Sequence, residues 1–300
     1  MRDESASAAV ESPLVTDQLP LDMPRPPQPL APLFRWPGGK RWLVPQLKDL
    51  VPTDLGRYYE PFFGGGALFL ALRPIDATIS DRNSELMDCY RAIRDDYSRV
   101  ASILRGLPRD REAYLKIRST IPDGVAARAA RLIYLTTLAF NGIYRVNRQG
   151  EFNVPYGGRR YDSLGDEETL RAHADAFATA EIKSVDFEKA VVGAGRGDFV
   201  YLDPPYTVTH SNNGFVRYND RIFSWGDQKR LAGLAESLSE AGCSVVVSNA
   251  FHDSISALYP SFRAVTVTRT SAMAATADKR GVIRELVLTN VAMGRSAQDG

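Results

Sequence analysis

The stretch "GRYYEPFFGGGALFLALRP", from Gly56 to Pro74, changes character twice. Its aromatic run "YYEPFF" has the length of a buried strand, three glycines interrupt it, and "ALFLAL" then follows at helical spacing. This order predicts a strand, a tight turn and a helix. Glycines after a strand let a ligand approach the backbone, and the N-terminus of the next helix favours anionic groups. By themselves, three glycines fit a plain tight turn as well as a binding turn.

The following segment repeats the alternation. "DATISD" predicts a second short strand that ends in Asp81, and residues 83–96 have an amphipathic helical pattern with Asn83 or Ser84 as the N-cap. Strands that alternate with helices are typical of a parallel α/β sheet. Asp81 lies about 20 residues beyond Glu60, where nucleotide-binding folds place an acid for ribose hydroxyls. Because the turn is not GxGxxG and carries bulky aromatic residues, we expect a nucleoside ligand without phosphates.

The middle and the end of the chain complete the predicted fold. Residues 98–179 are mainly helical in pattern, and one irregular stretch, 141–161, interrupts them. Strand–helix alternation then returns and predicts strands at 198–203 and 243–249, a helix at 225–242 that ends at Gly242, and an antiparallel pair at 262–270 and 282–290. The fold class is therefore a doubly wound α/β sheet with a helical insertion. We expect an N-terminal disordered tail at 1–32, a catalytic domain at 33–97 and 180–292, an insertion at 98–179 and a C-terminal tail at 293–300.

Composition limits the class of protein. The chain has 300 residues, 44% of them hydrophobic, and a net charge of +1, which neither indicates nor excludes a nucleic-acid partner. Cys89 and Cys243 lack the spacing of a zinc site or disulfide framework, so we expect two reduced buried thiols and no metal. Without a signal peptide or a long apolar run, we expect no membrane contact and a cytoplasmic location.

A second informative stretch is "FVYLDPPYT", in which a strand runs into "DPPY", Asp203 to Tyr206. An acid at the carboxyl end of a strand lies where open α/β sheets bind ligands. The Asp203 carboxylate and the Pro204 carbonyl can accept hydrogen bonds from an amino group, and proline adds no competing N–H. Tyr206 can stack on a planar base. A plain Pro-Pro turn is the alternative, and the glycine turn and Asp81 favour the binding interpretation.

Five motifs in order carry a family resemblance: "FRWPGGK" (34–40), "EPFFGGGALF", "SDRN" (80–83), "FNGIYRVNRQGEFNVPYG" (140–157) and "LDPPY". Together they resemble the Dam-like, D12 class, alpha group of S-adenosylmethionine-dependent DNA adenine-N6 methyltransferases over residues 33–290. The resemblance implies a Rossmann-like methyltransferase sheet with a helical target-recognition insertion. It also implies base flipping and transfer of a methyl group from S-adenosylmethionine to N6 of adenine in duplex DNA. Pro37 stands where the family commonly has alanine, and the tail before the first motif is longer.

The resemblance also assigns residues. Catalysis is assigned to Asp203, Pro204, Pro205 and Tyr206. Cofactor binding is assigned to Trp36, Lys40, Phe62, Gly64, Gly66, Asp81 and Asp203, with Lys40 as a partner for the methionine carboxylate and Asp81 for the ribose hydroxyls. Residues 182–187, "IKSVDF", match the family's third motif near the cofactor adenine. DNA contact is assigned to Asn141, Arg145, Asn147 and Arg148. Residues 141–161 carry four arginines against Glu151, an excess of three positive charges.

Two classes of alternative stay open. A "(D/N/S)PPY" corner also serves cytosine N4, RNA bases and a protein glutamine, so the chain can be an amino-methyltransferase of another substrate. The chain can also be an inactive DNA-binding module with this fold, although the intact "DPPY" and Asp81 argue against it. We expect duplex DNA as the partner. We also expect the enzyme to be a monomer. A cognate restriction endonuclease, as in a restriction–modification system, is a further candidate partner.

Overall fold

The computed structural model describes residues 28–158, 164–207, 223–270 and 282–291. Three predictions fall wholly or mainly outside these ranges: the N-terminal tail, Arg159 and Arg160 among the four arginines of residues 141–161, and the C-terminal tail. Within the predicted N-terminal tail, however, the Leu30 N–H donates to the Leu70 carbonyl at 2.9 Å. The chain therefore contacts the body of the protein two residues before the predicted boundary.

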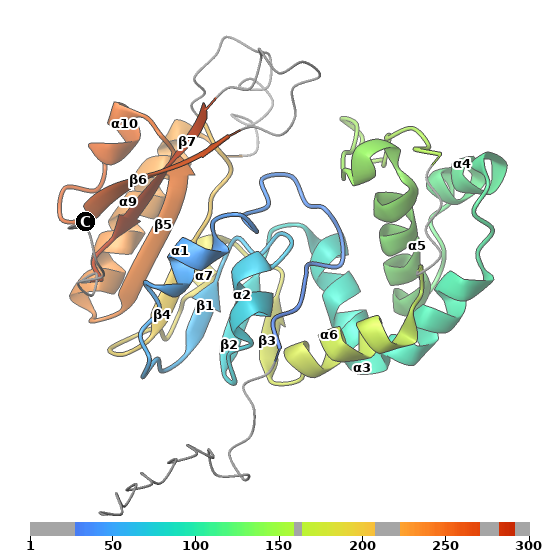
Figure 1. The fold of residues 1–300 in the computed structure, drawn as a ribbon, viewed down its shortest axis with the longest axis horizontal. Helices are drawn as coiled ribbons and strands as arrows, with labels where there is room; N and C mark the ends of the chain where they lie inside the picture. Colours follow the sequence, from blue (N-terminus) through green and yellow to red (C-terminus); the bar gives the residue numbers. More distant parts are fainter. Residues whose placement is uncertain (1–27, 159–163, 208–222, 271–281, 292–300) are drawn as a thin grey trace, which may run out of the picture.

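The described residues form alternating helices and strands (Figure 1). The strands are β1 (Tyr58–Glu60), β2 (Ala77–Ser80), β3 (Ala180–Lys183), β4 (Phe199–Leu202), β5 (Ser244–Ala250), β6 (Arg263–Thr270) and β7 (Val282–Thr289). The helices are α1 (Val44–Lys48), α2 (Ala67–Leu72), α3 (Ser84–Gly106), α4 (Arg111–Ser119), α5 (Val125–Leu138), the 3-10 turn η1 (Phe140–Gly142), α6 (Glu167–Phe177), α7 (Phe187–Ala190), α9 (Trp225–Glu240) and α10 (Asp253–Ser256).

The strands join in one sheet with the order β3-β2-β1-β4-β5-β7-β6. The first five are parallel, and β7 runs antiparallel between β5 and β6. Strand order reverses between β1 and β4, which are direct neighbours. The predicted doubly wound α/β fold and the predicted antiparallel pair at the end of the chain are confirmed.

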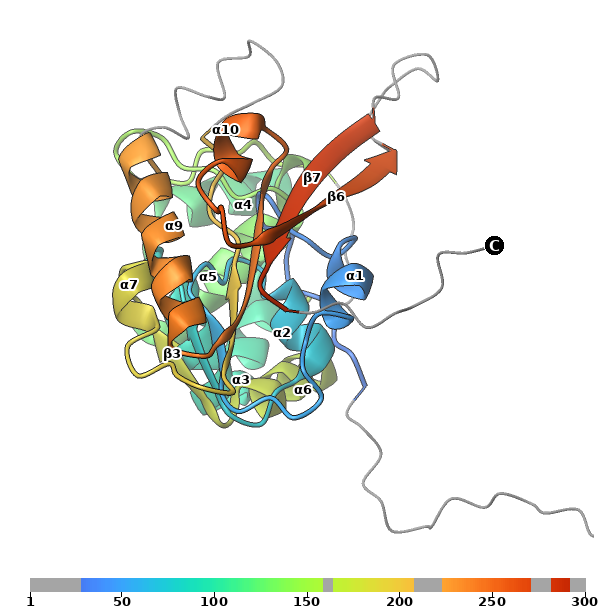
Figure 2. The same cartoon turned by 90° about the vertical axis from the view of Figure 1, so that its left-hand side faces the viewer.

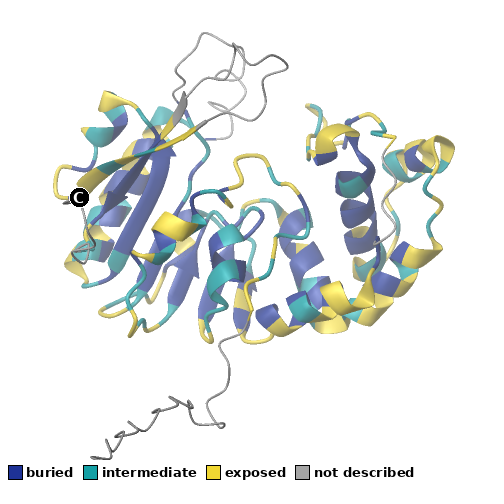
Figure 3. Ribbon diagram, in the orientation of Figure 1, coloured by how far each residue is buried: buried dark blue, intermediate teal, exposed yellow. Residues whose placement is uncertain are grey.

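Two hydrophobic clusters cover the two faces of the sheet. One face packs against α1, α2 and α3, and residues of α5 and α6 extend the same cluster. The other face packs against α7, α9 and α10. Figure 2 shows α7 and α9 on one side of the sheet and α1 and α2 on the other. Residues of the central strands β4 and β5 are almost all buried (Figure 3).

Local sequence signals explain where these helices begin and end. The Asn83 side chain accepts the Leu86 N–H and caps α3. Ser224 and Asp227 form a capping box at the start of α9. After α9 the chain turns at Gly242, whose φ of 91° lies in the region that favours glycine.

The helical part of the chain and the sheet share a helix, α3, and a hydrophobic core. Helix α3 begins beside β2 and continues to Gly106, and its only interruption is non-helical backbone at Asp96. Helices α4 and α5 lie beyond the edge strand β3 (Figure 1). The Phe69 and Phe177 rings, from α2 and α6, stack at 5.6 Å. The predicted insertion at 98–179 thus shares its core with the sheet.

Candidate active site

The carboxyl ends of the parallel strands gather the segments that the sequence singles out. The glycine turn follows β1, Asp81 follows β2, residues 184–187 follow β3 and Asp203 follows β4. Because β1 and β4 flank the point where strand order reverses, the turn and Asp203 lie at the crevice where open α/β sheets bind ligands. The structure therefore brings the predicted catalytic and cofactor segments to one edge.

The glycine turn is held by side chains on both sides. Gly64 donates its N–H to Asp81 Oδ2 at 3.0 Å, and its carbonyl accepts the Tyr90 hydroxyl at 2.8 Å. Gly66 has φ +63°, and a Cβ there would lie 2.3 Å from the Phe63 ring. Only glycine fits this position. Trp36 covers the turn so closely that a Cβ on Gly64 would lie 2.8 Å from its ring.

At the end of β4, Asp203 belongs to a buried ionic cluster. Lys40 Nζ lies 2.8 Å from Asp203 Oδ1 and 3.1 Å from Glu285 Oε1, and it also donates to the Gly38 carbonyl. The exposed fractions of the Lys40, Asp203 and Glu285 side chains are 7%, 16% and 6%. The ammonium also lies 4.7 Å from the centre of the Tyr206 ring. Lys40 is therefore engaged with the "DPPY" corner itself.

A hydrogen-bond chain fixes the same carboxylate from the strand side. Ser248 on β5 donates to Asp203 Oδ1 at 2.7 Å, and Tyr201 on β4 lies 2.9 Å from the Ser248 hydroxyl. Both Lys40 and Ser248 thus use Oδ1. Within the described ranges, no hydrogen bond or ion pair reaches Oδ2. One oxygen of Asp203 is anchored, and the other remains an acceptor.

Burial sets the charges around this cluster. Burial alone would lower the pKa of Lys40, but Asp203 and Glu285 outweigh it and raise that pKa. Burial raises the pKa of Glu285, and Lys40 opposes the shift. In β1, burial raises the pKa of Glu60 to about 8, although Tyr58 donates to Glu60 at 2.8 Å. Lys40 is therefore a cation at neutral pH, whereas Glu60 is mainly protonated.

Two hydroxyls of the segment that follows Asp203 in the chain are buried without a partner in the described part of the chain. They are Tyr206 OH and Thr207 Oγ1. An unpaired buried hydroxyl costs free energy, so such groups commonly mark a place where a ligand supplies the partner. Asp203 Oδ2 and these hydroxyls together offer one charged acceptor and two groups that both donate and accept.

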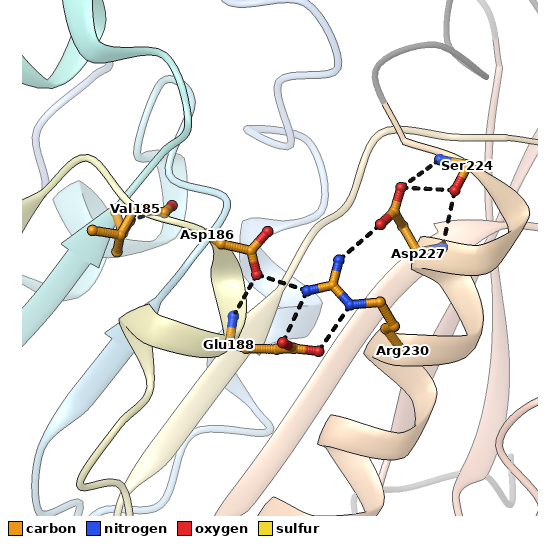
Figure 4. Close-up of polar contacts among 7 residues, drawn as sticks. Val185, Asp186, Glu188, Ser224, Asp227 and Arg230 are labelled. Carbon is orange, nitrogen blue, oxygen red and sulfur yellow. Dashed lines mark hydrogen bonds and ion pairs between the residues drawn. The ribbon is translucent and has the colours of Figure 1, made fainter.

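A salt-bridge cluster holds the segment after β3 to the start of α9 (Figure 4). Arg230 on α9 reaches Asp186 at 3.0 Å, Glu188 at 2.9 Å and Asp227 at 2.9 Å. Its guanidinium lies 4.8 Å from the Phe187 ring centre. The fork geometry of arginine lets one side chain bind three carboxylates in this way.

Aromatic packing links that segment to the glycine turn. Phe62 of the turn stacks on Phe187 at 5.4 Å and meets the Phe223 ring edge-on at 5.6 Å. Phe187 and Phe223 are buried, and Phe62 is partly exposed. The predicted cofactor residue Phe62 therefore lies next to the predicted third motif, residues 182–187.

Comparison with known proteins decides the family. A profile of the D12 class N6 adenine-specific DNA methyltransferases matches residues 36–273. The chain belongs to this family. Similar proteins include a Lactococcus lactis subsp. cremoris protein named Type II methyltransferase M1.LlaDCHI, 39% identical over 87% of this chain and 95% of its own length. Another, Type II methyltransferase M.MjaIII of Methanocaldococcus jannaschii, is 32% identical over 86% of this chain and 98% of its own. The DNA N-6-adenine-methyltransferase of Escherichia phage P1 is 29% identical over 85% of this chain and 35% of its own.

This D12 class methyltransferase carries the predicted DNA-contacting residues around a hairpin. Bridges pair Ala139 with Tyr156 and Val146 with Phe152. Trp36 stacks on Tyr144 of the hairpin at 4.5 Å. Because Trp36 also covers Gly64, one indole links the glycine turn to the hairpin.

The four predicted side chains differ in their freedom to contact DNA. Asn141 is exposed at φ 58°, and Arg148 is exposed. Arg145 is also exposed and donates to the Asn153 side chain at 2.8 Å. Asn147 accepts the backbone N–H groups of Gln149 and Glu151, so its carbonyl oxygen holds the hairpin turn. The prediction that Asn147 contacts DNA gains no support from this arrangement.

Sequence reasoning missed three residues of the methyltransferase site: Ser248, Tyr201 and Glu285. Glu285 had a detectable signal. Side chains two residues apart on a strand share a face, so Glu285 of β7 lies on the same face as the buried Val287. An acid on the apolar face of a strand requires a partner. Ser248 has a weaker signal, as a single hydroxyl in the apolar run of β5.

Within the described ranges, the structure has no candidate metal centre and no helix that could span a membrane. No group of three or more His, Cys, Asp or Glu side chains there is arranged to hold a metal ion. None of the helices described is long and apolar enough to cross a membrane. Cys89 and Cys243 are both buried and unbridged, as predicted.

Proposed function

We propose that this chain is a site-specific enzyme that methylates N6 of a flipped adenine in duplex DNA and uses S-adenosylmethionine as the donor. The observation that carries the proposal is the geometry of Asp203, whose Oδ1 is anchored by Lys40 and Ser248 while Oδ2 stays available. Family membership supports adenine in DNA as the substrate. The geometry of Asp203 supports its role as an acceptor for an amino group.

The residues present fit such a donor. The turn "EPFFGGG" contains no lysine or arginine that would bind a pyrophosphate. Asp81 uses its two oxygens for the N–H groups of Gly64 and Asn83, and the remaining lone pairs suit ribose hydroxyls. The partnerless hydroxyls of Tyr206 and Thr207 offer further polar contacts.

When bound, S-adenosylmethionine supplies a methyl group on a positively charged sulfur. Asp203 Oδ2 and the Pro204 carbonyl accept the two N6 hydrogens and orient the amino group. The acceptors also stabilise the positive charge that N6 develops. Tyr206 stacks on the base, and the rigid prolines keep the corner in place. Positioning of the amino group is expected to provide most of the acceleration.

The test measures methylated nucleosides by mass spectrometry after incubation of duplex DNA with the purified chain and S-adenosylmethionine. We expect N6-methyladenine, and we expect Asp203→Ala to lower kcat by about 10²–10³-fold, as loss of a catalytic electrostatic contact does. Asp175→Asn removes an exposed carboxylate of α6 and serves as the matched control. Formation of N4-methylcytosine without N6-methyladenine, or near-normal activity of Asp203→Ala, would contradict the proposal.

The biological setting is a further proposal. Two similar proteins are named type II methyltransferases, which supports a restriction–modification role with a cognate endonuclease. We also propose a cytoplasmic monomer. Sequencing that maps modified adenines in an expressing host would report the DNA site.

A further inference from the structure

The least explained charge in the site is that of Glu285. It lies on β7, far in sequence from every motif, yet its carboxylate is buried 3.1 Å from Lys40. Lys40 already pairs with Asp203 at 2.8 Å. One buried cation therefore lies between a buried carboxylate, Glu285, and a half-buried one, Asp203, and with both acids ionised the cluster carries a net charge of −1. A buried charge that is not required to neutralise its neighbour is costly and demands an explanation.

We propose that Glu285 gives the active site the negative charge with which it selects the sulfonium of S-adenosylmethionine over the neutral thioether of S-adenosylhomocysteine. The inference rests on the proposed methyl donor. Transfer breaks the sulfur–methyl bond, forms the N6–methyl bond and ends with loss of an N6 proton to water. The sulfur thus changes from a cation in the substrate to a neutral atom in the product.

Asp203 alone cannot give the site a net negative charge. Lys40 cancels the charge of Asp203, so that the pair by itself would give the site no net charge. Glu285 restores the negative charge. Glu60 is also buried near Asp203, but burial raises its pKa to about 8, whereas Lys40 opposes the corresponding rise in the pKa of Glu285.

The competing explanation is that Glu285 only holds Lys40 in position. Glutamine separates the two, because it has the size of glutamate and keeps an oxygen that accepts from Lys40 while the charge is lost. A purely structural role would leave the preference between the two ligands unchanged, since both share the adenosine and amino-acid parts.

Calorimetry measures the dissociation constants of both ligands for the wild type and for Glu285→Gln, Glu285→Asp and Glu181→Gln. We expect Glu285→Gln to lower the preference for S-adenosylmethionine about tenfold, because one unit of negative charge is lost from a site that water screens only weakly. Binding of S-adenosylhomocysteine should stay close to the wild-type value, which also shows that the site is folded. Glu285→Asp should keep the preference. Glu181→Gln removes a charge from the opposite edge strand β3 and should leave it unchanged.

Lys40→Gln provides a second test of opposite sign. It makes the cluster more negative, so the preference for the sulfonium should rise. Any lost contact between Lys40 and the methionine carboxylate affects both ligands equally and cancels in the ratio. An unchanged preference in Glu285→Gln, or a reduced preference in Lys40→Gln, overturns the inference. If the wild type binds neither ligand, the proposed donor fails first and the role of Glu285 fails with it.

Discussion

Burial raises the pKa of Glu60 to about 8, whereas glutamate in an unfolded chain titrates near 4.3. Between these values the folded protein retains a proton that the unfolded chain has lost. The contribution of Glu60 to stability is therefore fully present below about pH 4 and is lost as the pH rises through about 8.

Glu60→Gln is expected to remove this pH dependence, because glutamine is neutral throughout and still accepts from Tyr58. The variant's free energy of unfolding, relative to the wild type, should rise by a few kcal/mol between about pH 5 and pH 8. Urea unfolding at several pH values measures it. Glu168→Gln removes an exposed carboxylate of α6 and is the control. A pH-independent difference between Glu60→Gln and the wild type would show that Glu60 is not the group responsible.

At this scale, the sequence identified the acids at strand ends and missed their partners. Asp81 and Asp203 stand out because each follows a short apolar run, and the sheet places both at the same edge. Glu285 and Ser248 could not be connected to Asp203 from the sequence, because their contact depends on which strands become neighbours. For Asn147, the DNA contact that the family resemblance implies stays a prediction, and its carbonyl oxygen accepts two backbone N–H groups of the local turn.

Helix α9 and the segment after β3 are joined by the three ion pairs of Arg230 and by shared hydrophobic packing. Such partly exposed ion pairs contribute about 0.2–1 kcal/mol each, so Arg230→Gln should reduce stability only modestly. The substitution should affect binding of S-adenosylmethionine more than stability, because Phe187 in this segment stacks on Phe62 of the glycine turn.

We expect Arg230→Gln to raise the KM for S-adenosylmethionine about fivefold, the equivalent of about 1 kcal/mol, with kcat little changed. Arg230→Lys should recover only part of the loss, since lysine lacks the planar fork. Arg105→Gln breaks a comparably exposed salt bridge to Glu167 in the helical part and is the control. Steady-state kinetics at varied donor concentration decides; equal KM values for Arg230→Gln and Arg105→Gln would refute the role.

Among the elements, those with local signals were predicted closely. The β1–turn–α2 unit follows from its glycines and spacing, and α9 from its capping residues and Gly242. The antiparallel pairing of β6 with β7 was also predicted. Their order was not: β7, the later strand, lies next to β5. A hairpin can join a sheet through either strand, and only packing over the whole face decides which one enters.

The helical insertion and the sheet share one hydrophobic cluster that crosses the predicted domain boundaries. Tyr90 of α3 contacts Phe177 of α6 at 5.1 Å, and Phe177 stacks on Phe69 of α2. We therefore expect a single cooperative thermal transition in calorimetry, with equal calorimetric and van't Hoff enthalpies. Two separate transitions would show that the insertion folds independently. Deletion of residues 98–179 should expose this cluster and give an insoluble product.

The place of β7 also has a consequence for synthesis on the ribosome. Lys40, Asp203 and Glu285 are translated in that order, and the last of them arrives on a strand that must insert between β5 and β6. At about 5–20 residues per second, roughly 4–16 s separate the translation of Asp203 from that of Glu285. Until β7 is made, the edge of β5 that pairs with β7 has no partner strand, and Lys40 lacks the second of its two acids. The methyltransferase thus acquires its full active-site charge only as its final strand is made.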